Sequence, residues 1–190
     1  MSFSAVILAG GQSSRMGRDK AFLEIGGQTL LARQIETARA AGATEVFISG
    51  RDEVDYSAFN CRVLKDNFPA AGPLAGTEAA LAAATNPLLL VLAVDLPAMT
   101  TEFLQRLRAG CAKNIGAIPR VNETLEPLAA FYPKAAHTNA EKMLAEKKFA
   151  VKDFAGGCVQ AGLAVFIAFS ATDSVHFKNC NLPADLPCLT

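Results

Sequence analysis

Residues 3–20 of the chain read FSAVILAGGQSSRMGRDK. The first part, Phe3–Leu8, is mostly apolar, contains β-branched residues and runs into Gly10-Gly11. This pattern predicts a buried β-strand that enters a loop. The glycines let the backbone approach a ligand, and successive N–H groups in such a loop form an anion-binding concavity. We therefore expect a first strand followed by an anion-binding loop.

Three cations, Arg15, Arg18 and Lys20, follow the glycines and are partly offset by Asp19. Backbone donors, a bidentate guanidinium and a mobile ammonium together suit a polyphosphate. Two familiar phosphate motifs do not fit, because Walker A needs a different glycine spacing and the dinucleotide-binding loop needs GxGxxG. The plain alternative is a glycine turn with solvated charges. The position after a first strand favours the phosphate interpretation.

Beyond this loop, apolar strand patterns alternate with amphipathic helix patterns over roughly the first 120 residues. Helices are expected to begin at Thr29, ending before Gly42, and at Thr100. The alternation predicts an α/β fold: one three-layer αβα domain over residues 1–190, with a mainly parallel, Rossmann-like sheet. Further strands are expected at 46–49, 61–64, 88–94, 115–118, 128–131 and 163–169, and further helices at 74–84, 136–147 and 182–186.

Composition narrows the class of protein. Of 190 residues, 51% are hydrophobic and 19% are charged, which excludes a disordered chain. The 18 basic and 18 acidic residues balance, which argues against duplex DNA or an anionic membrane surface as a partner. We therefore expect neither a nucleic-acid nor a membrane partner.

The cysteines and apolar runs predict a cytoplasmic protein. The five cysteines are odd in number, widely spaced and without a CxxC pair, so neither a disulfide framework nor a zinc site is indicated. Buried free thiols in a reducing compartment are expected instead. The longest apolar stretches fall far short of the roughly 20 residues that cross a bilayer.

Two aspartates follow expected strands, where parallel sheets bind ligands. Asp95 comes after the apolar run 88–94 and is a candidate ligand for Mg²⁺; the alternative is a cap on the following turn. Asp66 follows the strand at 61–64 and either contacts a ligand or initiates a turn. His137 and His176 are too isolated to form a metal pair and are interpreted as structural or exposed.

Residues 8–20, LAGGQSSRMGRDK, resemble the pattern LAGG-x-S-x-RMG-x-DK of nucleotidyltransferases with a GT-A-like α/β fold. Within these, the chain is most similar to the molybdenum cofactor guanylyltransferase family. The segments GPLAG at 72–76, VDLP at 94–97 and FKNCNLPADL at 177–186 match that family in order and spacing. Three positions depart from the pattern: Ser49 replaces a usual Asn, Leu182 replaces a usual Thr, and Ala93-Val94 lack the cysteine seen in some members.

The resemblance implies transfer of GMP from GTP to molybdopterin or molybdenum cofactor, with Mg²⁺ as cofactor and pyrophosphate as product. Molybdoenzyme maturation proteins are further candidate partners. Implied catalytic residues are Arg15, Lys20 and Asp95, with Asp95 also the metal ligand, and implied molybdopterin-binding residues are Asn179 and Asn181. Implied nucleotide-binding residues are Leu8, Ala9, Gly10, Gly11, Lys20, Ser49, Asp66, Gly72, Pro73 and Asp95.

Three other functions stay open at this point. A molybdopterin cytidylyltransferase or a sugar-phosphate nucleotidyltransferase would use the same phosphate chemistry with another base or acceptor. A non-catalytic nucleotide-binding module that delivers cofactor is the alternative from another class. The combination of Arg15, Lys20 and Asp95 favours catalysis, because binding alone tolerates loss of the metal carboxylate.

Overall fold

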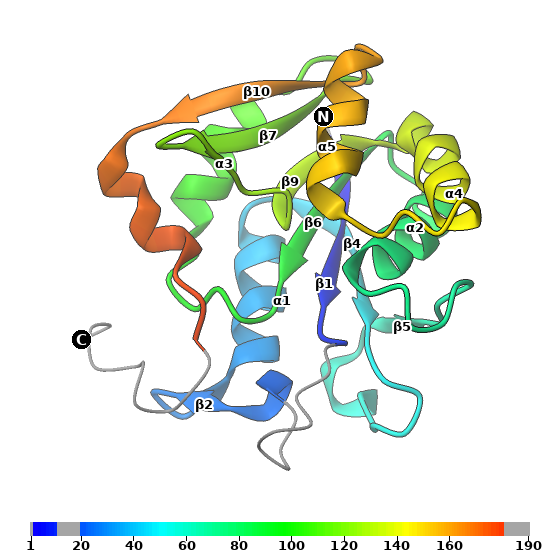
Figure 1. The fold of residues 1–190 in the computed structure, drawn as a ribbon. Helices are drawn as coiled ribbons and strands as arrows, with labels where there is room; N and C mark the ends of the chain where they lie inside the picture. Colours follow the sequence, from blue (N-terminus) through cyan, green and yellow to red (C-terminus); the bar gives the residue numbers. More distant parts are fainter. Residues whose placement is uncertain (1, 11–19, 181–190) are drawn as a thin grey trace.

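The computed structural model describes residues 2–10 and 20–180, and it places helices on both faces of a central sheet (Figure 1). The main sheet has the strand order β10-β7-β9-β6-β1-β4-β5, with β8 paired to β7. Its strands are β1 (Phe3–Leu8), β4 (Ala43–Ser49), β5 (Arg62–Leu64), β6 (Leu88–Ala93), β7 (Gly116–Val121), β8 (Thr124–Leu125), β9 (Ala129–Pro133) and β10 (Ala164–Phe169).

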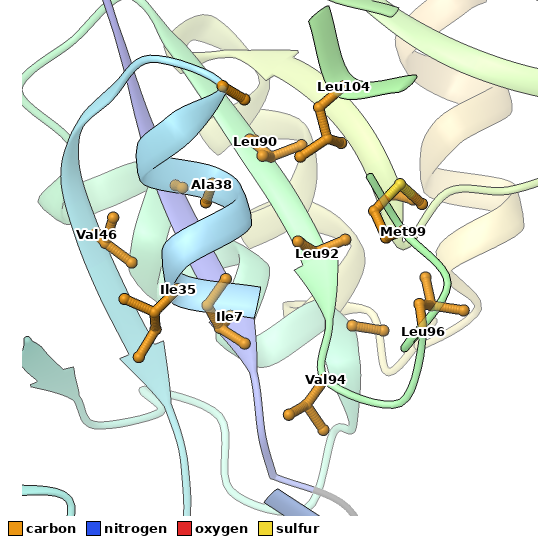
Figure 2. Close-up of a cluster of buried hydrophobic side chains, with 14 of the residues drawn as sticks. Ile7, Ile35, Ala38, Val46, Leu90, Leu92, Val94, Leu96, Met99 and Leu104 are labelled. Atoms are coloured by element: carbon orange, nitrogen blue, oxygen red, sulfur yellow. The ribbon is translucent and has the colours of Figure 1, made fainter. Parts of the chain in front are cut away.

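Two apolar layers cover the sheet. One face packs against α1 (Leu30–Ala40) and α3 (Thr101–Ala109), and Figure 2 shows part of this core around Ile7, Leu92 and Leu104. The other face packs against α2 (Pro73–Ala83), α4 (His137–Ala145) and α5 (Val151–Gln160). The sequence prediction of a three-layer αβα arrangement is confirmed.

The strand directions differ between the two halves of the sheet. Strands β6, β1, β4 and β5 are mutually parallel, as are β7 and β10. Strand β9 lies between these groups and runs antiparallel to both β6 and β7, and β8 runs antiparallel to β7. The sheet is therefore mixed, with parallel pairing predominant as predicted.

Local signals explain where several elements begin and end. Thr29 caps α1 by accepting a hydrogen bond from the Ala32 N–H at 3.2 Å, and Gly42 follows the helix with a φ of +106°. Thr100 caps α3 in the same way, accepting from the Phe103 N–H at 3.2 Å. A threonine oxygen satisfies an N–H that has no partner within the helix, and a positive φ favours glycine.

Some elements were not predicted. Helix α5 contains Gly156-Gly157, which weakens helix propensity, and it is stabilised instead by burying Phe154 and Cys158. The 3₁₀ turns η1 (Lys20–Phe22), η2 (Ser57–Phe59), η3 (Lys134–Ala136) and η4 (Ala171–Phe177) and the hairpin of β2 (Glu24–Ile25) and β3 (Gln28–Thr29) were also missed. The helical turn expected at 182–186 lies outside the described residues.

The thiols are less uniformly buried than expected. Cys158 and Cys180 are buried, but Cys61 and Cys111 are partly exposed. Burial raises the pKa of the Cys111 thiol to about 11 and that of Cys158 to about 12. Among the described residues, no helix combines the length and the apolar character needed to cross a membrane.

Candidate active site

The carboxyl ends of the four parallel strands lie level with one another. Leu8 of β1 is in register with Ser49 of β4 and Ala93 of β6, and Ser49 is in register with Leu64 of β5. The loops after these strands therefore emerge at one edge of the sheet, the usual ligand edge in open α/β folds. This register brings the start of the glycine loop, at Ala9 and Gly10, and both candidate aspartates to the same edge.

A cavity of about 520 Å³ lies at this edge, beside β1, β4, β5 and the start of α2. Its volume falls within the range of small-molecule sites. Six of the predicted nucleotide-binding residues line it: Leu8, Gly10, Ser49, Asp66, Gly72 and Pro73. Four further lining residues were not predicted: Gly50, Arg51, Glu53 and Ala70. Their position in the loop directly after β4, at the ligand edge of the sheet, is the signal that would have found the first three.

The main chain of the glycine loop is tied to β4 where it leaves β1. The N–H groups of Ala9 and Gly10 both donate to the Ser49 carbonyl oxygen, at 2.8 and 3.0 Å. These two amides are thereby occupied, so they are not the anion donors that the loop was expected to supply. Gly11 and Arg15 lie outside the described residues, and their predicted roles are untested by this geometry.

Ser49 joins the sheet, α2 and Asp66. A Cβ placed on Gly76 would overlap the Ser49 hydroxyl, so the second glycine of GPLAG lets α2 pack directly on this strand end. The Ser49 hydroxyl donates to Asp66 Oδ1 at 3.5 Å. At position 49, where the family pattern usually has asparagine, the serine side chain therefore forms a hydrogen bond with Asp66.

Asp66 presents a partly buried carboxyl group to the cavity. Burial raises its pKa above the ordinary aspartate value, the hydrogen bond from Ser49 lowers it, and the charges of Asp52 and Glu78 raise it further. A carboxyl group in this position can accept hydrogen bonds from hydroxyl or amino groups of a ligand. The structure thus places Asp66 at the cavity wall, and its contact with a ligand stays a prediction.

Buried Glu78 supports the turn that carries Asp66. Glu78 lies on α2 and is 3% exposed. Its Oε2 accepts a hydrogen bond from the Asn67 side-chain amide at 3.1 Å, and its Oε1 lies 2.8 Å from His137 Nε2. His137 is therefore a structural partner of a buried carboxylate, consistent with its interpretation from the sequence.

Tyr56 connects the cavity wall to the turn that carries Lys20. The Arg51 N–H donates to the Tyr56 hydroxyl oxygen at 3.2 Å, and a Cβ on Gly50 would overlap the tyrosine ring. The same ring stacks on Phe22 of η1 with a centroid separation of 6.0 Å. Tyr56 is 2% exposed and had no signal in the sequence pattern.

Lys20 and Asp95 form an ion pair at the end of β6. Lys20 Nζ lies 3.8 Å from Asp95 Oδ2, and both side chains are about one quarter exposed (28% and 24%). Burial raises the pKa of Asp95, whereas the positive charge of Lys20 lowers it. Two of the three residues predicted to be catalytic, Lys20 and Asp95, are thus adjacent, although they are 75 positions apart in the chain.

The turn after Asp95 is held by hydrogen bonds to four consecutive carbonyl oxygens. Cys180 N–H donates to Asp95 O at 2.9 Å, and Gln34 Nε2 donates to Leu96 O at 2.6 Å. Arg33 Nε donates to Pro97 O at 3.1 Å, and His176 Nδ1 lies 2.7 Å from Ala98 O. Because a carbonyl only accepts, His176 Nδ1 carries the proton. Helix α1 and the C-terminal part of the chain thus clamp this turn from two sides.

The donor set around Asp95 suits magnesium. Within residues 2–10 and 20–180 there is no group of three or more His, Cys, Asp or Glu side chains able to hold a metal. Mg²⁺ is usually bound by one or two carboxylates together with waters and substrate phosphates. One partly exposed carboxylate at the same sheet edge as the cavity fits that pattern, and it does not fit a structural zinc site.

One of the two predicted acceptor-binding residues, Asn179, lies near this turn. Asn179 is exposed and directly precedes Cys180, whose N–H is bonded to the Asp95 carbonyl. Asn181 lies outside the described residues. The structure therefore brings Lys20, Asp95 and the main chain at Asn179 together, beside a separate cavity that contains Asp66.

Comparisons of sequence agree on one family. Residues 5–160 match the family described as MobA-like NTP transferase domain. The chain is 39% identical over 187 residues to a probable molybdenum cofactor guanylyltransferase from Opitutus terrae, covering 97% of this chain and 93% of the relative.

Comparisons of structure support the same fold. Molybdopterin-guanine dinucleotide biosynthesis protein A from Archaeoglobus fulgidus superposes with a TM-score of 0.73 at 23% identity, covering 96% of this chain and 94% of that chain. The 2-C-methyl-D-erythritol 4-phosphate cytidylyltransferase from Thermus thermophilus superposes with a TM-score of 0.72 at 22% identity, covering 98% and 96%. The predicted nucleotidyltransferase fold is confirmed, and it is shared by proteins named for different nucleotides.

Proposed function

The chain belongs to the MobA-like NTP transferase family of nucleotidyltransferases, and we propose that it transfers GMP from GTP to molybdopterin or its metal-loaded form. The observation that carries this proposal is the position of the Lys20–Asp95 pair at the strand edge that also holds the Asp66 cavity. A nucleoside triphosphate bound at this edge would have its base and ribose in the cavity and its phosphates near the Lys20–Asp95 pair.

The reaction needs no protein nucleophile. A terminal phosphate oxygen of molybdopterin attacks the α-phosphorus of GTP and forms a new P–O bond. The bond from that phosphorus to the bridging oxygen breaks, and pyrophosphate leaves with the electron pair. Because the attacking oxygen is already anionic, the protein has to align the reactants and to neutralise charge.

The residues of this chain divide that work between them. Lys20 binds oxygens of the α-phosphate while negative charge shifts during transfer, and Arg15 with the loop binds the leaving pyrophosphate. Asp66 accepts a hydrogen bond from the ribose or base. Asp95 would hold Mg²⁺, which would supply Lewis-acid stabilisation of phosphate charge. Asn179 and Asn181 bind the acceptor, molybdopterin.

A turnover assay tests the proposal. Purified enzyme is mixed with molybdopterin, Mg²⁺ and α-labelled GTP or CTP, and both labelled dinucleotide and pyrophosphate are measured. We expect formation of both products with GTP and a clear preference for GTP in competition. Preferential use of CTP would replace the proposed activity by a cytidylyltransferase activity, and tight GTP binding without pyrophosphate release would contradict group transfer.

A further inference from the structure

The chain between β10 and the Asp95 turn follows a path over α3. After β10, residues 170–180, here called the C-terminal segment, cross from the edge of the sheet to the carboxyl end of β6 (Figure 1). Most of this segment is η4, whose side chains are largely exposed. A short exposed segment has few apolar contacts to hold it in place, so its position depends on particular anchors.

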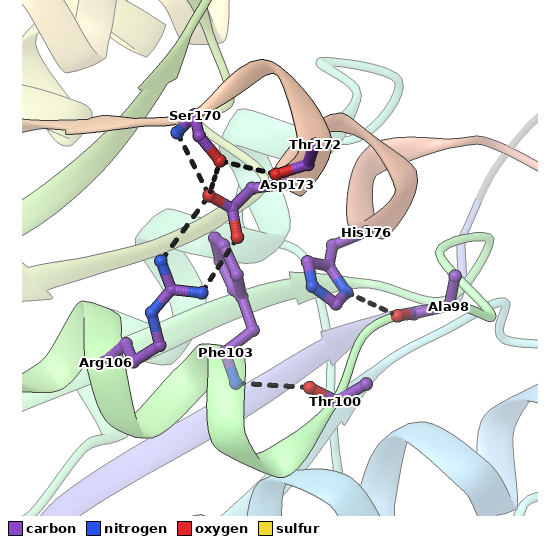
Figure 3. A network of polar contacts seen from close by, with 8 residues as sticks. All are labelled: Ala98, Thr100, Phe103, Arg106, Ser170, Thr172, Asp173 and His176. Atoms are coloured by element: carbon purple, nitrogen blue, oxygen red, sulfur yellow. Dashed lines mark hydrogen bonds and ion pairs between the residues drawn. The ribbon is translucent and has the colours of Figure 1, made fainter.

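The first anchor is an ion pair with α3. Arg106 Nη1 and Nη2 lie 2.8 and 3.4 Å from the two carboxylate oxygens of Asp173 (Figure 3). Asp173 also accepts hydrogen bonds from the Ser170 N–H at 3.0 Å and the Ser170 hydroxyl at 2.6 Å. The Arg106 guanidinium and these Ser170 donors hold the pKa of Asp173 at about 2. Asp173 is 6% exposed, so this carboxylate is buried and fully paired.

Aromatic contacts support that ion pair. The Arg106 guanidinium carbon lies 5.1 Å from the centroid of the Phe169 ring and 5.8 Å from that of Phe103. Stacking on two rings limits the orientations of the guanidinium, so the bidentate pair costs less side-chain entropy to form.

The second anchor is His176. Its Nδ1 donates to the Ala98 carbonyl oxygen at 2.7 Å, and its ring lies 4.7 Å from the Phe103 ring (Figure 3). Phe177 packs edge-on against the same phenylalanine at 5.2 Å. Four positions after His176, the Cys180 N–H donates to the Asp95 carbonyl. His176 and the Cys180 N–H therefore bind the two ends of the turn that begins at Asp95, whereas the Arg106–Asp173 pair ties the segment to α3.

The anchors are separate from the nucleotide cavity. None of the described residues lining that cavity belongs to the C-terminal segment or to α3. Loss of an anchor would shift Asn179 relative to Asp95 while leaving Leu8, Ser49 and Asp66 in place. The two substrates of the proposed reaction would then be affected unequally.

We propose that Arg106, Asp173 and His176 are positioning residues for the acceptor: they seat the C-terminal segment so that Asn179 lies beside the Asp95 turn. This inference rests on the proposed function, because it takes Asn179 to contact the acceptor. The residues act through the main chain of the segment and are not required to touch either substrate.

Two pairs of variants test the role of each anchor. Arg106→Gln removes the ion pair and Arg106→Lys restores a charge; His176→Phe keeps a ring on Phe103 but removes the donor. His176→Asn restores a donor, because the asparagine amide nitrogen is as many bonds from Cα as Nδ1. Lys113→Gln is the matched control, since it removes an exposed positive charge shortly after α3.

Steady-state kinetics supply the first measurement. For Arg106→Gln and His176→Phe we expect KM for molybdopterin to rise by about threefold to tenfold, as for loss of one hydrogen bond, with KM for GTP unchanged. The Lys and Asn variants should recover part of the loss. Lys113→Gln should behave as wild type.

Thiol reactivity supplies a measurement that is independent of turnover. Cys180 is 1% exposed at the end of the segment, and Cys158 is 0% exposed on the other side of the sheet. Labelling with a maleimide, followed by peptide mass spectrometry, should show faster reaction of Cys180 in Arg106→Gln and His176→Phe. Cys158 should stay protected, which separates release of the segment from general unfolding.

The outcomes are distinguishable. If the variants keep wild-type KM for molybdopterin, or if Cys180 stays as protected as in the wild type, the inference is wrong while the proposed function stands. Equal changes in KM for both substrates would also contradict it. If the wild-type enzyme binds GTP but transfers nothing to molybdopterin, the proposed function fails and this inference fails with it.

Discussion

The two halves of the sheet place functional groups by different means. On the parallel side, β1, β4, β5 and β6 end level with one another, and Leu8, Ser49 and Asp66 reach the cavity simply by following or ending those strands. On the other side, β9 is antiparallel to its neighbours, and residues 170–180 reach the site through side-chain anchors. The first arrangement depends on backbone register, and the second depends on a few individual hydrogen bonds.

This difference implies different sensitivity to substitution. Register is maintained by many ladder hydrogen bonds, so the groups on the parallel side should keep their positions when one supporting polar contact is lost. On the other side, the C-terminal segment should move away from the site when a single anchoring side chain is removed. The expected effects below run from the largest to the smallest.

Lys20→Ala should have the largest effect on catalysis. Removing one preorganised donor to the transferring phosphate lowers kcat by roughly 10²–10³. The measurement is the rate of pyrophosphate release at saturating GTP and molybdopterin, with Lys113→Ala as a control for loss of an exposed lysine. Near-normal turnover would remove Lys20 from the proposed mechanism.

Two glycine substitutions compare the packing of the two halves. A Cβ on Gly116 would overlap the main-chain carbonyl of Phe131, whereas a Cβ on Gly76 would overlap the Ser49 side chain. Main-chain atoms in a sheet can move aside less easily than a side chain can. Gly116→Ala should therefore lower the free energy of unfolding by about 3 kcal/mol, and Gly76→Ala should lower it by about 1–3 kcal/mol.

Urea unfolding measures both values. Gly157→Ala is the matched control, since a Cβ there meets nothing within 4 Å and the residue lies within α5. Helix propensity should stabilise that variant by roughly 0.5–1 kcal/mol. A larger loss in Gly76→Ala than in Gly116→Ala would contradict the packing described here.

The Asp173 anchor should show a characteristic dependence on pH. Its pKa falls from 3.8 to about 2 on folding, so its stabilisation is fully present above about pH 5 and is lost as pH falls through 4 toward 2. We expect the difference in unfolding free energy between wild type and Asp173→Asn to be constant near neutrality and to shrink in acid. Urea unfolding at several pH values between 2.5 and 7 measures this difference. A difference that grows on acidification would contradict the lowered pKa of Asp173.

Tyr56→Phe should have the smallest effect. The ring and its stack on Phe22 are kept, and the Arg51 N–H loses its acceptor, which costs about 1 kcal/mol or less in a partly solvated position. KM for GTP should rise by no more than a few fold. A fall in activity as large as that expected for Lys20→Ala would show that the positions of groups on the parallel side also depend on single contacts.

The same contrast explains what could be predicted from the sequence. Strand and helix signals are local, so the bounds of β1, the caps Thr29 and Thr100, and six residues of the cavity followed from pattern and resemblance. Parallel register then brings strand ends together without further information.

Contacts between distant parts of the chain left no local signal. Arg106 and Asp173 are 67 positions apart. His176 was interpreted as structural or exposed, but its partner, the Ala98 carbonyl oxygen 78 positions earlier, could not be named from the sequence. Gln34 had a partial signal, because a glutamine on the apolar face of an amphipathic helix needs a buried partner, here the Leu96 carbonyl.

The most direct test of the account is thermal unfolding with GTP, CTP, ATP and UTP, each with and without Mg²⁺, on wild type and on Asp66→Ala and Asp95→Asn. A nucleotide at 100 times its Kd adds about 2.7 kcal/mol, which raises Tm by roughly 5–10 °C at this size. We expect a shift selective for GTP with Mg²⁺, reduced in Asp66→Ala and less dependent on Mg²⁺ in Asp95→Asn. No shift with any nucleotide, or an equal shift in wild type and Asp66→Ala, would contradict a nucleotide site at this edge of the sheet.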